Sequence, residues 1–293
     1  MSSSHLLSAQ ELLAAQQQGI NLKVFDCSYD LNNPEYGILQ YVDAHIPGAV
    51  YADLGHALSS SSSDASSGGR HPLPSRDSVV RWLEQMGLNN DSLVVVYDRN
   101  NSSFCVRLWW MLRWIGHENV KVLNGGFQAW CEQGYCLESG EGDVSAGSVR
   151  TLRFQQPLTK LVNAEYVLLH LNDPTLTIID ARAAERYRGE TEPLDPFAGH
   201  IPGALNRPFS DNLQADGTFK PAHVLRQEFA SLLKDKSADH VVCYCGSGVT
   251  ATLNILALEL AGLGSASLYG GSWSDWSHRT DYPKEKSLRR EKN

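Results

Sequence analysis

The sequence predicts an α/β protein made of two tandem copies of one fold, each a doubly wound parallel sheet with helices on both faces. The chain has 293 residues, a length typical of about two domains. Short runs rich in valine and isoleucine alternate with stretches of helical periodicity, which favours parallel sheets. Blocks of similar sequence also recur in the same order, about 150 residues apart.

The repeat is clearest in the pentapeptide His-Ile-Pro-Gly-Ala, which occurs at 45–49 and again at 200–204. Two long copies exclude a solenoid array, whose units are about 20–50 residues. The other matched segments are 7–10 and 162–165, 24–27 and 178–181, 96–98 and 243–245, and 123–126 and 268–271. We expect a first domain at 1–140, a linker at 141–157, a second domain at 158–285 and a basic tail at 286–293, with disorder from Lys284 onward.

Local signals place the elements of the first half in order. Ser8 and Glu11 have the spacing of a capping box, which predicts a short helix directly after Ser8. The serine- and glycine-rich composition of 59–69 predicts a flexible loop. The further expected elements are a strand at 23–26, a helix at 79–86, a buried strand at 93–98 and a helix with Leu108, Met111, Leu112 and Ile115 on one apolar face.

The second half centres on a strand, a glycine-punctuated loop and a helix in direct succession. The apolar run at 241–244 predicts a buried strand, and the loop begins at Cys245. A helix should follow and end at Gly262. Its apolar positions, at spacings i, i+3, i+4 and i+7, are Leu253, Leu256, Ala257 and Leu260.

Cys245 stands where a nucleophile is expected. Backbone N–H groups converge between a strand's end and a helix N-terminus, and they stabilise a thiolate. Gly246 and Gly248 let the backbone wrap closely around the sulfur. Ligands of doubly wound sheets bind at the carboxyl ends of the strands. Cys243, in contrast, should be a buried thiol on the strand face opposite Tyr244.

Composition limits the classes of function. The formal net charge of −8 argues against a nucleic-acid partner, and no apolar run approaches the length that spans a membrane. The start of the chain lacks the features of a secretory signal. Six scattered cysteines suit a reducing compartment, so we expect a cytoplasmic protein. Because Cys243 and Cys245 have no second ligand pair at zinc spacing, neither a metal nor another cofactor is expected.

The loop from Cys245 to Thr250 resembles the active-site loop of the rhodanese superfamily, and the repeat resembles its tandem-domain members. The neutral residues of the loop are most like those of 3-mercaptopyruvate sulfurtransferases. The resemblance implies that Cys245 carries sulfane sulfur as a persulfide, from 3-mercaptopyruvate to cyanide or a thiol acceptor, such as a small thiol or a thioredoxin-like protein. It also implies that the loop residues Gly246, Gly248, Val249 and Thr250 contact the substrate. Asp98 replaces the cysteine in the first copy, which should therefore be inactive.

The resemblance implies arginines that bind the substrate. Arg186 matches the family's substrate-binding arginine, since a guanidinium can hold a carboxylate bidentately. The alternative for Arg186 is a surface ion pair with Glu185 or Glu190. Arg182 matches another family arginine, which could serve only the electrostatics of the fold. The family's second substrate arginine is missing from 189–195.

The resemblance also implies a Ser-His-Asp relay beside the cysteine. Ser247 matches the serine, and His71 matches the histidine, which the first domain would supply. The alternative for His71 is a solvated loop residue. Gly55 stands at the aspartate's position, which leaves Asp53, Asp64 or no residue as the third member.

Three other functions compete with this interpretation. Thiosulfate sulfurtransferases favour cationic loops, but the missing second arginine argues for that class. Cysteine phosphatases and arsenate reductases need an arginine where Ala251 stands. A non-catalytic binding module would not need an intact Cys245 loop. His45 and His200 occur in both copies, including the inactive one, so we expect structural roles for them.

Overall fold

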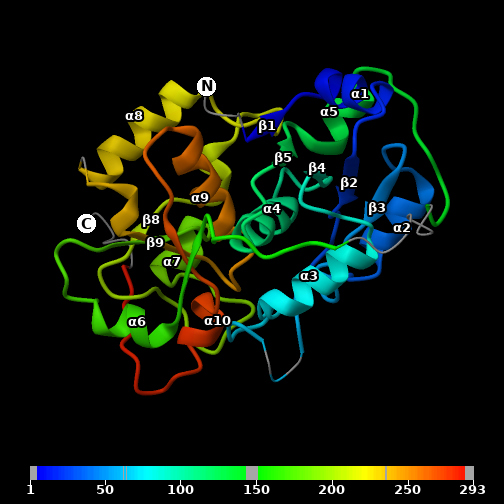
Figure 1. Cartoon of the computed structure of the whole chain (residues 1–293). Helices are drawn as coiled ribbons and strands as arrows, with labels where there is room; N and C mark the ends of the chain where they lie inside the picture. Colours follow the sequence, from blue (N-terminus) through cyan, green and yellow to red (C-terminus); the bar gives the residue numbers. More distant parts are fainter. Residues whose placement is uncertain (1–4, 62, 64, 143–150, 235, 288–293) are drawn as a thin grey trace. The chain divides into compact units, whose positions relative to one another are not determined.

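The computed structural model describes residues 5–61, 63, 65–142, 151–234 and 236–287, and its helices and strands are labelled in Figure 1. Contacts divide the chain into two compact units. The first unit comprises Met1–Ser66, Pro74–Leu158 and Leu213–Phe219, and the second comprises Ser67–Leu73, Thr159–Asn212 and Lys220–Asn293. Each unit contains a five-stranded sheet.

The sheet of the first unit has the order β1-β5-β4-β2-β3, and all its pairings are parallel. Its strands are β1 (Leu6–Leu7), β2 (Leu22–Asp26), β3 (Ala49–Tyr51), β4 (Leu93–Tyr97) and β5 (Val120–Leu123). Its helices are α1 (Ala9–Gln17), α2 (Tyr36–Asp43), α3 (Arg76–Gln85), α4 (Cys105–Trp114) and α5 (Gly126–Glu132).

Helices cover both faces of the first sheet. Val24 of β2 packs in one core with Leu12 of α1 and Trp130 of α5. The next residue, Phe25, faces the other way, because successive strand residues alternate, and its ring lies 5.5 Å from that of Trp82 in α3. The predicted apolar face of α4 is buried, and so is every other residue of this helix. A helix packed on all sides is mostly apolar all round, and in α4 only Arg107 and Arg113 carry a charge.

The second unit repeats this topology in the order β6-β10-β9-β7-β8, again with parallel pairings throughout. Its strands are β6 (Lys160–Val162), β7 (Thr177–Asp180), β8 (Leu205–Asn206), β9 (Val241–Tyr244) and β10 (Ser267–Tyr269). Its α-helices are α6 (Ala164–Leu169), α7 (Ala184–Arg188), α8 (Ala222–Leu233), α9 (Ala251–Leu260) and α10 (Ser272–Trp276), with 3₁₀ turns η1 (Phe209–Asn212) and η2 (Ala238–His240). The predicted doubly wound α/β class is confirmed for both copies.

The core of the second unit holds the strand that leads to the candidate nucleophile. Tyr244 of β9 packs with Val167 of α6 and with Trp273 of α10. On the other face, α9 packs against β9 and α8. Cys243 is fully buried, as predicted, and burial raises the pKa of its thiol.

Two local predictions are confirmed at the residue level. The Ser8 hydroxyl accepts from Glu11 N–H at 3.2 Å, and the Glu11 carboxylate accepts from Ser8 N–H at 2.8 Å, which completes the capping box of α1. The predicted helix after the Cys245 loop is α9, and Gly262 beyond its end has the left-handed φ of +67°.

The segments outside the sheets pack more closely than expected. The expected disorder from Lys284 is wrong for the described residues 284–287, because Glu285 exchanges two backbone hydrogen bonds with His200. Residues 288–293 lie outside the described chain. Of the expected linker, 143–150 also lie outside it, whereas Leu158 N–H donates to Arg113 within the first unit at 3.0 Å.

Each sheet reverses the direction in which strands are added between two neighbouring strands, β2 and β4 in the first unit and β7 and β9 in the second. In the second unit the chain passes outward from β7 to β8 and then returns across β7 to β9, so the carboxyl end of β9 lies at a switch point. Cys245 directly follows β9, and Asp98 directly follows the equivalent strand β4. Among the described residues, no helix is long and apolar enough to cross a bilayer.

Candidate active site

Cys245 is held at the end of β9 by backbone contacts with α10. Its N–H donates to the Ser272 hydroxyl at 3.1 Å, and its carbonyl accepts from Trp273 N–H at 3.0 Å. The residue is 2% exposed. Gly248 has a φ of +73°, and a β-carbon there would lie 2.3 Å from the Gly270 carbonyl oxygen. Only glycine fits this turn, which fixes the conformation of the loop at Gly248.

The first unit shows what a loop at this position binds. The buried carboxylate of Asp98 accepts four backbone hydrogen bonds of 2.8 to 2.9 Å, from Asn100, Ser102, Phe104 and Cys105. Burial raises the pKa of Asp98, and the backbone donors oppose that shift. The loop after β4 is thus a nest of N–H groups around a side-chain oxygen.

Ser247 and His71 meet in the second unit. His71 Nδ1 lies 2.8 Å from Ser247 Oγ, a hydrogen-bond distance that joins residues 176 positions apart. His71 belongs to the segment Ser67–Leu73, which packs in the second unit although it comes from the first half of the sequence. His71 thus reaches Ser247 from the first half of the sequence, as expected, and does so in a segment that packs within the second unit.

The same segment, of which only 67–69 belong to the expected flexible loop, is held by hydrogen bonds. Leu73 N–H donates to the Ser67 hydroxyl at 2.9 Å, and Arg70 N–H donates to the Ser274 hydroxyl at 2.9 Å. Ser274 N–H in turn donates to the Gly246 carbonyl at 2.8 Å. Two hydrogen bonds thus connect Arg70 to the loop that carries Cys245.

The third member of the relay stays open. Asp53 is engaged inside the first unit, where its carboxylate accepts from Gly55 and His56 N–H and lies 2.9 Å from His56 Nδ1. Its other oxygen accepts from the Tyr51 hydroxyl at 3.3 Å. Asp64 lies outside the described residues.

Arg186 lies beside the loop and is paired with acids other than those expected. Its Nη2 donates to Glu192 at 2.6 Å and lies 3.6 Å from Asp195. Glu190 pairs instead with Arg188. The Arg186 Nη1 atom lies 3.7 Å from the point where a β-carbon of Gly246 would stand. The guanidinium therefore lies between these acids and Gly246.

Arg70 is a site residue that the motif comparison missed. Its Nη2 lies 3.5 Å from the same β-carbon position of Gly246, and its Nη1 donates to Asp195 at 2.9 Å. Two guanidinium groups thus meet next to the residue that follows Cys245. Its position in the sequence could have identified it, because Arg70 directly precedes the expected relay residue His71.

Arg182 is engaged within the fold. Its guanidinium donates to Asp180 at 2.6 Å, to Glu192 at 3.1 Å and to the Gly199 carbonyl at 2.6 Å, and it lies 4.7 Å from the centre of the Trp273 ring. The side chain is almost fully buried. This geometry favours the alternative role in the electrostatics of the fold over contact with a substrate.

Val249 and Thr250 complete the loop and start α9. The Val249 carbonyl accepts from the Thr252 hydroxyl at 2.6 Å, and Thr250 is the N-cap residue of the helix. Because Val249 is buried, a substrate would meet the backbone of the loop rather than this side chain. The N-terminus of α9 places the positive end of a helix dipole at this loop.

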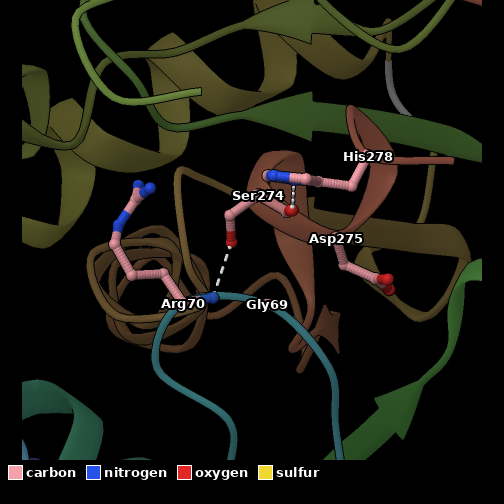
Figure 2. Close-up of a pocket in the computed structure, with 5 residues that line it drawn as sticks. All are labelled: Gly69, Arg70, Ser274, Asp275 and His278. Carbon is pink, nitrogen blue, oxygen red and sulfur yellow. Dashed lines mark hydrogen bonds between the residues drawn. The ribbon is translucent and has the colours of Figure 1, made fainter. Parts of the chain in front are cut away.

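A pocket of about 420 Å³ adjoins Arg70 in the second unit (Figure 2). It is lined by Gly69, Arg70, Ser274, Asp275 and His278. Figure 2 shows that the Arg70 guanidinium is directed away from Asp275 and His278. The pocket wall thus fixes the backbone of Arg70 and leaves its charged end to Asp195 and Gly246.

Comparisons with known proteins agree with this geometry. The family model described as "Rhodanese-like domain" matches residues 8–133 and 163–279. The chain is 44% identical to a Pseudomonas aeruginosa protein named "Probable 3-mercaptopyruvate sulfurtransferase", over 94% of this chain and 96% of that protein. It is 32% identical to the Bos taurus "Thiosulfate sulfurtransferase", over 92% and 89% of the two chains. The solved structure of 3-mercaptopyruvate sulfurtransferase from Leishmania major is similar with a TM-score of 0.82 at 30% identity, over 94% of this chain and 75% of that one.

Proposed function

This chain belongs to the rhodanese-like family, and from that premise we propose that it is a sulfurtransferase with 3-mercaptopyruvate as its donor. Cys245 receives the sulfur as a persulfide and passes it to cyanide or a thiol acceptor. The observation that carries the choice of donor is the 2.8 Å contact between Ser247 Oγ and His71 Nδ1. It gives a proton relay to a loop that is otherwise neutral.

The chemistry needs such a relay. The Cys245 thiolate attacks the sulfur of 3-mercaptopyruvate, the sulfur–carbon bond breaks, and its electron pair goes to the carbon as the enolate of pyruvate. That carbon must gain a proton, which Ser247 can deliver with His71 behind it. The persulfide then meets a thiolate acceptor, which takes the outer sulfur and restores the Cys245 thiolate.

The carboxylate of the donor has a binding place in this arrangement. Arg186 Nη1 and Arg70 Nη2 both face Gly246, so one carboxylate beside Gly246 can accept from both groups. Arg70 thereby takes the role of the arginine missing from 189–195. The backbone N–H groups of the Cys245 loop would hold the persulfide, in the way that the equivalent loop holds Asp98.

Thiosulfate is the second candidate donor, and Arg70 is the observation that favours it. This dianion needs no proton when sulfite leaves, and the two guanidinium groups supply N–H donors that the side chains of the loop lack. With this donor the contact between Ser247 and His71 would have no chemical task. A small thiol is the simplest acceptor, and a thioredoxin-like protein is a further one; the cytoplasmic location stays a prediction.

The persulfide is tested by mass spectrometry of the whole protein after incubation with 3-mercaptopyruvate. We expect the mass of one sulfur atom to be added at Cys245, and Cys245→Ser to abolish both the added mass and turnover. Cys243→Ser is the matched control, because this neighbouring thiol is buried in the core, and it should keep most of the activity. Substantial sulfur transfer by Cys245→Ser would overturn the assignment.

A further inference from the structure

We propose that Asp195 is a specificity-determining residue that makes the donor site select a singly charged anion over a doubly charged one. The inference rests on the proposed function, because it concerns the donor site of that reaction. Asp195 acts through Arg70 and Arg186 and is a positioning residue, since it contacts the two guanidinium groups that lie beside Gly246.

The two arginines share the Asp195 carboxylate. Arg70 Nη1 lies 2.9 Å from Asp195 Oδ1, Arg70 Nη2 lies 3.5 Å from Oδ2, and Arg186 Nη2 lies 3.6 Å from Oδ2. The Asp195 side chain is 0% exposed, whereas Arg70 and Arg186 are 31% and 19% exposed. The anion is thus buried beneath two cations that reach the surface of the site.

Asp195 closes a connected row of charges. From the core outward, Asp180 pairs with Arg182, Glu192 bridges Arg182 and Arg186, and Asp195 bridges Arg186 and Arg70. Three guanidinium groups therefore meet three carboxylates, and the formal charge of the row is zero. The donor site offers N–H donors with directional geometry but little excess positive charge.

This balance distinguishes donors by their charge. Directional donors serve one carboxylate as well as they serve the oxygens of thiosulfate, whereas net positive charge attracts a dianion twice as strongly as a monoanion. Asp195→Asn keeps the size and one acceptor oxygen but leaves the row with a charge of +1. We expect that change to favour the dianion.

Binding of the anions themselves tests the inference without turnover. In a Cys245→Ala background, titration calorimetry would measure Kd for thiosulfate and for pyruvate, the singly charged product. Asp195→Asn should lower the Kd for pyruvate about threefold and the Kd for thiosulfate about tenfold, as one added positive charge in a partly solvated site implies. With Cys245 present, the ratio of kcat/KM for thiosulfate to that for mercaptopyruvate should rise about threefold, the quotient of those two effects.

Matched variants separate charge from structure. Asp195→Glu keeps the charge and should keep the donor ratio of the unmodified protein. Asp173→Asn removes an exposed carboxylate that bonds Thr175 and should leave the ratio unchanged. Equal shifts for both anions in Asp195→Asn, or the same ratio change in Asp195→Glu, would overturn the inference.

A second measurement needs no change at Asp195. In the Cys245→Ala protein, raising the salt concentration from about 0.02 to 0.2 M should weaken the binding of thiosulfate no more than the binding of pyruvate. A neutral site has little charge for the salt to screen. A steeper loss for thiosulfate would contradict the neutral row. If the unmodified chain transfers no sulfur from either donor, the proposed function fails, while these binding ratios still decide the role of Asp195.

Discussion

The hydroxyl of Ser247 touches a histidine that lies 176 positions away in the sequence, and this contact separates the two donors chemically. When mercaptopyruvate gives up its sulfur, the carbon left behind needs a proton. When thiosulfate gives up its sulfur, sulfite departs and needs no proton. A relay is useful for only one of these reactions. The proposed preference for mercaptopyruvate therefore rests on these two side chains.

We predict that Ser247→Ala and His71→Ala each lower kcat with mercaptopyruvate about 100-fold, the usual contribution of a positioned proton donor, and change kcat with thiosulfate only a few-fold. Steady-state rates with both donors and cyanide as acceptor would check this. Ser277→Ala, at another buried serine of the second unit, is the control. Equal losses on both donors would instead support the thiosulfate alternative.

Asp98 shows the structural use of the same loop position. Four backbone N–H groups depend on its two oxygens, and Asp98→Asn leaves only one oxygen to accept them. We predict a loss of about 2–4 kcal/mol in the free energy of unfolding, because at least one buried donor loses its partner. Urea denaturation would measure it, with the exposed Asp91→Asn as the control. A change below about 0.5 kcal/mol, the range of ordinary surface substitutions, would contradict it.

Each unit also contains the same closing strap, formed by a glutamate that follows the last helix of its sheet. Glu138 pairs with His45, and Glu285 pairs with His200, each through an isolated antiparallel bridge. Each carboxylate accepts from the glycine of the His-Ile-Pro-Gly-Ala turn, at 2.8 Å for Gly48 and at 3.2 Å for Gly203. The predicted structural roles of both histidines agree with their burial beneath these straps.

We predict that Glu138→Ala and Glu285→Ala each lower the free energy of unfolding by about 1 kcal/mol, the worth of one hydrogen bond to a charged group that is partly solvated. Both variants should keep sulfur transfer within about twofold, since a loss of this size leaves nearly all molecules folded. Thermal and urea unfolding would measure the change. The exposed Glu141→Ala serves as the control, and strap variants as stable as this control would refute the idea.

The two units share one topology but differ in what they carry. Both sheets have the same strand order, yet the first has a buried carboxylate where the second has a cysteine. The second unit is also not a continuous stretch of chain, because Ser67–Leu73 packs in it and Leu213–Phe219 packs in the first. The second unit consequently takes Arg70 and His71 from the first half of the sequence.

We predict that residues 159–293 expressed alone have kcat/KM for mercaptopyruvate at least about 100-fold below that of the whole chain, because His71 is absent. Residues 1–158 alone should be inactive, since Asp98 cannot hold a sulfane sulfur. Circular dichroism would establish that each half folds, and the full-length His71→Ala variant provides a reference of intact fold. Full turnover by the C-terminal half would exclude Ser67–Leu73 from the site.

Patterns within short windows determined much of this protein from the sequence alone. The repeat, the strand before Cys245, the helix after it and the capping box at Ser8 all follow from local periodicity and turn chemistry. The family also follows, because the loop and the repeated blocks are contiguous segments. Such features need no knowledge of how distant parts of the chain meet.

Only the tertiary structure decided which charges pair and which segments belong to the site. Arg186 pairs with Glu192 rather than with nearer acids, Arg70 reaches Gly246, and Asp195 joins the two arginines. Several acids lie within a few residues of Arg186, so sequence spacing gives no preference among them. Packing of the backbone selects the partners, since a guanidinium binds the carboxylate that its buried position brings within about 3 Å.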